Sequence, residues 1–84
     1  MSRHMDGKRL RLYDAVGRAL HQRRNGAGLS VATFAKTLGI SADYLSKIEG
    51  GETACPLHVL VDIAHELDVS LDDLVPVLTA EGAA

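Results

Sequence analysis

The chain has 84 residues, of which 46% are hydrophobic and 24% charged, with a formal net charge of −2 and one cysteine. This length limits the chain to one domain, and the composition is that of a globular protein rather than a disordered or fibrous one. A single cysteine excludes an internal disulfide, no apolar run approaches the ~20 residues that span a bilayer, and no signal-peptide pattern is present, so we expect a cytoplasmic protein.

The predicted elements are helices, since one Phe, two Tyr and no Trp are too few aromatic residues for a typical β-sandwich. Residues 1–9 are polar and lack an apolar period, so we expect a flexible basic arm there, in part a cloning remnant. Leu12, Val16 and Leu20 mark the buried stripe of a first helix over about 10–25.

Residues 31–38 and 42–50 form two short helical patterns around Gly39, which can take the positive φ of a tight turn. A small residue, Ala35, stands where the two helices would cross, and Leu45 fills the angle between them. The expected N-caps are Ser30 and Ser41. This is the pattern of a helix-turn-helix, in which the second helix is held outward and can enter a DNA major groove.

The rest of the chain predicts two more helices. Pro56 fits the first turn of a fourth helix over about 56–67, which carries a wide apolar stripe. Ser70 caps a fifth, which Pro76 either ends near Val75 or kinks. We therefore predict an all-α, compact five-helix domain. Its boundaries are 10–79, with a tail at 80–84.

The charges are polarised along the chain. All nine Lys and Arg residues lie in 1–47 with only three acidic residues, a balance of +6, whereas 48–84 holds eight acidic residues and no Lys or Arg. Such a field can turn the basic end toward phosphates while the acidic end stays in water, although a chance division of solvated charges would look the same.

A run of residues carries a resemblance to a known family. They are Gly28-Leu29-Ser30, Phe34-Ala35, Leu38-Gly39-Ile40-Ser41, Tyr44-Leu45-Ser46-Lys47-Ile48-Glu49, Gly51, Leu57, Leu60, Ala64, Leu67, Val69-Ser70-Leu71 and Leu74. On these, the chain resembles the phage-repressor and Cro-like helix-turn-helix family, also called the XRE family, over about 15–75. The resemblance implies a lambda-repressor-like domain that usually binds operator DNA as a two-fold dimer. Family members commonly regulate transcription as repressors, restriction–modification controllers, antitoxins or developmental switches.

The resemblance also implies which residues read bases. They are Ser41, Ala42, Asp43, Ser46 and Lys47. Lys47 can donate to guanine O6 and N7, Asp43 can accept from a cytosine amino group, and Ala42 can contact a thymine methyl. Two other roles are open for Asp43: it can stabilise the positive end of its helix, or pair with Lys47 at i,i+4.

Phosphate contacts would come from backbone N–H groups at the start of the second helix and from a few side chains. The residues are Ser30, Val31, Tyr44, Arg9 and Arg11. Tyr44 can equally pack at the domain edge, and the two arginines can equally belong to a solvated tail. Two positions depart from the family: Val31 stands where a glutamine is usual, and Glu52 lies in a loop that is usually polar or basic.

Two further sets have structural roles. Arg24 and Glu49 match a pair that ties the first helix to the end of the third in family members. The apolar residues that follow the fourth helix can either close the core or form a dimer seam, and a partly exposed seam is favoured because a domain this small has little core left for them. They are Leu74, Val75, Val77 and Leu78.

No pattern predicts catalysis, a cofactor or a metal site. His58, Asp62 and His65 share one helical face, but a solvated face explains them better than a metal site. Cys55 stands before a helix start, where the helix dipole can lower a thiol pKa, although an inert cysteine is favoured. The leading hypothesis is a DNA-binding transcriptional regulator. The alternative is an antitoxin or other protein-interaction module that uses the acidic second half.

Overall fold

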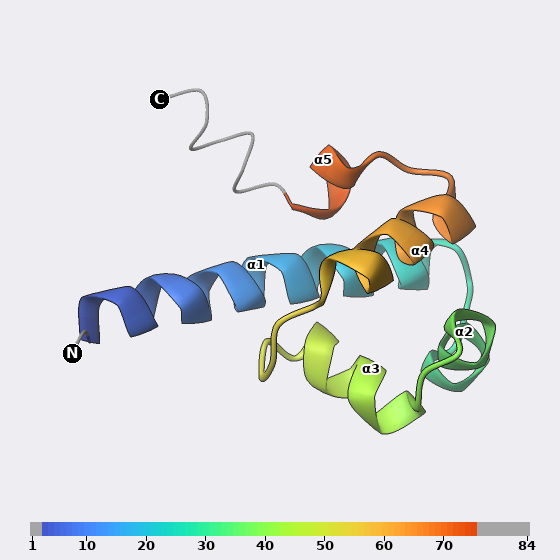
Figure 1. Cartoon of the computed structure of the whole chain (residues 1–84). Helices are drawn as coiled ribbons and strands as arrows, with labels where there is room; N and C mark the ends of the chain where they lie inside the picture. The colour runs from blue at the N-terminus through green and yellow to red at the C-terminus, as the bar shows by residue number, and fades with distance from the viewer. Residues whose placement is uncertain (1–2, 76–84) are drawn as a thin grey trace.

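A computed structural model describes residues 3–75, with side chains from Arg11 onward. Its helices are α1 (Arg3–Gly26), α2 (Val31–Leu38), α3 (Ala42–Glu49), α4 (Leu57–Leu67) and α5 (Leu71–Leu74), and the described range holds no strand. In the view of Figure 1, α2 and α3 lie below the C-terminal half of α1, and α5 lies above it. The predicted all-α, five-helix class is confirmed.

The bounds of α2 to α5 agree with the prediction to within a residue or so, but α1 does not. It begins at Arg3 instead of near residue 10, so the backbone expected to be an arm is helical from Arg3 on. The first seven residues of α1 need no buried stripe. Once packing has formed a helix, each added residue costs little free energy because it gains a backbone hydrogen bond. Pro56 also differs slightly, since it is the N-cap of α4 rather than part of its first turn.

The ends of the short helices are capped as the sequence predicts. The hydroxyls of Ser30, Ser41 and Ser70 each accept a hydrogen bond from the backbone N–H three residues ahead. Gly39 has φ 74°, a left-handed conformation that lets the chain turn sharply from α2 into α3. A cap that the sequence did not reveal is Asp68, a non-glycine residue with φ 55° that ends α4.

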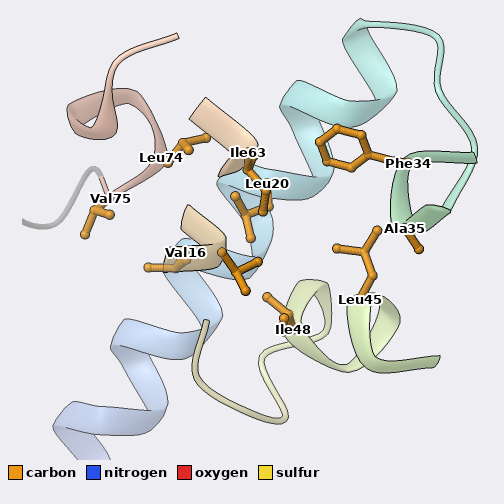
Figure 2. Close-up of a cluster of buried hydrophobic side chains, with 10 residues drawn as sticks. Val16, Leu20, Phe34, Ala35, Leu45, Ile48, Ile63, Leu74 and Val75 are labelled. Atoms are coloured by element: carbon orange, nitrogen blue, oxygen red, sulfur yellow. The ribbon is translucent and has the colours of Figure 1, made fainter. Parts of the chain in front are cut away.

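The core is one apolar cluster to which every helix contributes. Figure 2 shows its side chains converging around Leu20 of α1. Phe34 and Ala35 of α2, like Leu45 and Ile48 of α3, are at most 1% exposed, in agreement with the prediction that the two helices pack against each other in the core. Burying four such residues between α2, α3 and α1 fixes the direction of α3.

The predicted dimer seam is wrong for two of its four residues. Leu74 is 0% exposed and Val75 is 8% exposed, and both belong to the core cluster of the chain itself. A domain this small has few apolar side chains, and α5 folds back so that Leu74 closes the interior beside Ile63 (Figure 2). Val77 and Leu78 lie outside the described residues.

Candidate nucleic-acid interface

The third helix, α3, has a buried side and an exposed side. Leu45 and Ile48 point into the core, at 0% and 1% exposure. All five residues predicted to read bases are exposed. They are Ser41, Ala42, Asp43, Ser46 and Lys47. We call the surface formed by these five residues the outward face of α3. A helix that presents one free side from the edge of a domain has the shape that a DNA major groove admits.

The polar groups of this outward face are already organised. The Ser41 hydroxyl accepts a hydrogen bond from the Tyr44 N–H at 3.0 Å, so part of its hydrogen-bonding capacity serves as a helix cap. Lys47 Nζ lies 3.2 Å from Asp43 Oδ2, in an i,i+4 ion pair. Asp43 also lies in the first turn of α3. Asp43 is therefore placed for both structural roles considered for it: it lies at the positive end of the helix, and it pairs with Lys47.

The residues predicted to contact phosphates fall into different environments. Ser30 is exposed at the start of α2, where its hydroxyl donates to Thr33 Oγ1 and accepts from the Thr33 N–H. The side chains of Val31 and Tyr44 are partly buried against the core. Because the Val31 side chain carries no hydrogen-bond donor, this residue can offer only its backbone N–H to a phosphate. Arg11 is exposed on α1. Arg9 belongs to α1 by its backbone, and its side chain lies outside the described residues.

A buried ion pair joins α1 to the C-terminal end of α3. Arg24 Nε and Nη2 donate to the two carboxylate oxygens of Glu49 at 2.8 and 3.0 Å, and Nη1 donates to the Leu29 carbonyl at 2.6 Å. Both charged side chains are only 6% exposed. The hydrogen bonds to Glu49 raise the pKa of Arg24, against the opposing effect of burial. The predicted structural pair is therefore present, and it also fixes the chain that leads into α2.

Two residues of α1 that lie against the end of α3 were not predicted from the sequence, one beside the ion pair and one against the backbone. His21 Nδ1 lies 3.1 Å from Glu49 Oε1 and 3.2 Å from Arg24 Nη2. Gly17 is where α1 touches the end of α3: a Cβ there would lie 2.6 Å from the carbonyl oxygens of Ile48 and Glu49. A signal existed for both, since His21 precedes Arg24 by three residues on the same helical face, and a glycine inside a helix has a cost that packing must offset.

Other candidates lie away from the outward face of α3. Burial raises the pKa of the Cys55 thiol to about 12, which is opposite to the helix-dipole effect considered for it. Cys55 lines a cavity of about 120 Å³ with apolar neighbours such as Leu12 and Val16. Within the described side chains, no three His, Cys, Asp or Glu residues are arranged to hold a metal ion. None of the described helices combines the length and apolarity needed to cross a membrane.

The chain is similar to a helix-turn-helix family model and to a protein named as a transcriptional regulator. A family model described as a helix-turn-helix domain matches residues 15–78. The uncharacterized HTH-type transcriptional regulator YazB of Bacillus subtilis strain 168 is 37% identical over 60 residues, which are 71% of this chain and 87% of YazB.

Two crystal structures are similar over most of the fold. That of the clp gene regulator ClgR from Corynebacterium glutamicum has a TM-score of 0.75 at 28% identity, over 86% of this chain and 77% of the other. That of the restriction-modification controller protein C.AhdI from Aeromonas hydrophila has a TM-score of 0.69 at 27% identity, over 74% of this chain and 94% of the other.

Proposed function

The chain belongs to the XRE-like helix-turn-helix family of transcriptional regulators, and we propose from this that it binds a specific operator DNA sequence as a homodimer and represses transcription there. The observation that carries the proposal is the outward face of α3, which is exposed along its length while Leu45 and Ile48 anchor the opposite side. We propose no catalytic role. Because such a regulator works on chromosomal DNA, we propose a cytoplasmic location.

In the proposed complex, α3 enters the major groove. Base edges would face Ser41, Ala42, Asp43, Ser46 and Lys47. The start of α2 would lie against the backbone, with the N–H groups of Ser30 and Val31 near a phosphate, as helix N-termini favour. Further phosphate contacts would come from Tyr44, Arg9 and Arg11. The balance of +6 over residues 1–47 supports this orientation, because it draws that half toward the duplex.

The geometry of major-groove recognition supports the proposed homodimer. A single α3 of eight residues reads only a few base pairs, and two copies about 34–36 Å apart would read successive major grooves. Of the four residues predicted as the seam, Val77 and Leu78 remain as the proposed contact. A dimer that covers two successive grooves would also block other proteins from that DNA, which is why we propose repression.

Selection of bound sites from a random DNA pool, followed by fluorescence anisotropy on the selected site, tests this function. We expect a preferred sequence with two-fold symmetry, and an affinity that falls with salt at a slope of several, reflecting several phosphate contacts. Sedimentation of the complex should give two chains per site. Affinity for every selected sequence that never exceeds the affinity for random DNA would refute the proposal and favour the alternative, an antitoxin or other protein-interaction module.

A further inference from the structure

We propose that Asp43 and Lys47 act as one recognition unit that selects a G·C base pair, with Lys47 on the guanine and Asp43 on the cytosine. This inference rests on the proposed function, because it assumes that the outward face of α3 meets base edges. It specifies which DNA the protein prefers.

The two side chains hold the charges that α3 can offer to DNA. The third charged residue of this helix is Glu49. Its Oε2 lies 2.8 Å from Arg24 Nε in an ion pair, and its side chain is only 6% exposed. Lys47 and Asp43 are instead 52% and 79% exposed, and their charged ends are 3.2 Å apart. Ala42 brings no polar side-chain atom, and the Ser41 hydroxyl already serves as a cap. Charged recognition by this face therefore depends on the ion pair.

The pair matches the major-groove edge of a G·C base pair in spacing and polarity. Guanine O6 and the cytosine N4 amino group are hydrogen-bonded to each other, about 2.9 Å apart, and present an acceptor beside a donor. Lys47 Nζ and Asp43 Oδ2 present a donor beside an acceptor at 3.2 Å. Placed edge to edge, Lys47 donates to O6 while Asp43 accepts from N4, and the attraction between the two side chains is kept.

A second acceptor on the guanine favours a G·C pair over the other base pairs. Guanine N7 lies beside O6 on the outer side, within reach of the same Lys47 ammonium, which has three donors. An A·T pair also offers a donor beside an acceptor, but there Lys47 would meet the lone O4 of thymine next to its methyl group. A reversed C·G pair would set Lys47 against an amino donor and Asp43 against acceptors, so orientation is selected as well.

Asp43 makes DNA binding depend on the base sequence, whereas Lys47 alone would be attracted to DNA of any sequence. Near DNA, an exposed carboxylate is repelled by phosphates unless it accepts hydrogens from a base amino group. Removing Asp43 should therefore strengthen binding to DNA in general while abolishing the preference for cytosine. A structural role limited to the helix terminus would change stability but not base preference.

Modified bases in the selected site give the sharpest test, because each removes or blocks one atom. Replacing the guanine by 7-deazaguanine removes N7, and we expect the wild-type protein to lose about tenfold in affinity while Lys47→Ala loses almost nothing further. Methylating the cytosine at C5 crowds the neighbouring N4, and we expect it to weaken the wild type but not Asp43→Ala. The double variant should distinguish modified from unmodified sites about as well as either single variant. Because the two residues act together, losing one of them already removes the shared contact.

Arg18→Ala is the matched control. Asp14 and Arg18 form another exposed i,i+4 ion pair, 2.9 Å long, but on α1 rather than on α3. This variant should keep the wild-type response to both modified bases. An equal response of Lys47→Ala and wild type to 7-deazaguanine, or a uniform gain in affinity for Asp43→Ala without lost cytosine preference, would overturn the inference. A wild type that prefers no sequence would instead refute the proposed function.

Discussion

Among the glycines that the structure describes, Gly17 is the one where an added Cβ would lie closest to other atoms. A Cβ at this position would lie 2.6 Å from two carbonyl oxygens, those of Ile48 and Glu49, and 2.9 Å from the Glu49 carbonyl carbon. These are backbone atoms, so no side chain can rotate out of the way. To restore ordinary contact near 3.4 Å, α1 and the end of α3 would have to separate by about 0.8 Å.

We expect Gly17→Ala to destabilise the protein by about 2 kcal/mol. Overpacking of this kind costs roughly 1–3 kcal/mol or more, and the better helix propensity of alanine returns at most about 1 kcal/mol. The separation would also stretch the hydrogen bonds between Arg24 and Glu49, which span the same two helices. Urea unfolding followed by circular dichroism measures the change, and the midpoint of thermal unfolding should fall by about 10 °C.

Gly7→Ala is the control for helix propensity. Gly7 also lies within α1, but a Cβ there would have nothing within 4 Å. This variant should leave stability unchanged or raise it by up to about 1 kcal/mol. If Gly17→Ala proves as stable as Gly7→Ala, the close approach of α1 to α3 does not exist in solution. Weaker operator binding by Gly17→Ala would further link this contact to the presentation of α3.

The other predictions concern an ion pair, a thiol and a leucine that are buried or partly buried. Arg24→Met should cost about 3–5 kcal/mol in urea unfolding, because it leaves the Glu49 carboxylate buried without its partner. Combining it with Glu49→Leu should recover part of that loss, and a double variant as unstable as the single one would contradict this account. Since burial raises the pKa of Cys55 from 9.0 to about 12, the folded protein holds this proton more tightly, and stability should fall as pH rises through that interval. Cys55→Ala, unfolded at pH 8 and pH 10, should lose that part of the fall; identical pH dependence in both proteins would refute it. Leu74→Ala should cost about 2–5 kcal/mol in the single chain, whereas Leu57→Ala, at a residue 69% exposed, should change stability by less than about 0.5 kcal/mol. A Leu74→Ala loss confined to dimer dissociation would contradict its place in the core.

The helix-turn-helix could be predicted from the sequence because its determinants are local. Ser30, Ser41 and Gly39 act within three or four residues of themselves, as caps and as a left-handed turn. The apolar period of residues 31–50 likewise separates the buried side of α3 from its outward face without reference to the rest of the chain. The exposed side of α3 could therefore be predicted from local patterns, whereas the candidate base-reading residues on it followed from the resemblance to the helix-turn-helix family.

The start of α1 could not be predicted in the same way. Its first turns carry no apolar period, and the buried stripe at Leu12, Val16 and Leu20 covers only the part of the helix that packs. Extension to Arg3 depends on helix propagation, for which periodicity gives no sign.

The contacts between segments far apart in the chain depended on the tertiary structure. Composition and spacing established an all-α domain, its turn, and the polar face of α3, because these follow from interactions between near neighbours. The packing of the helices decided whether Leu74 lies in the core or on a dimer seam. It also decided whether the pKa of the Cys55 thiol is lowered or raised. The contact of Gly17 with the end of α3 and the place of His21 beside Glu49 also join residues about 30 positions apart. Distances of this kind arise only when the helices pack together, and no local pattern encodes them.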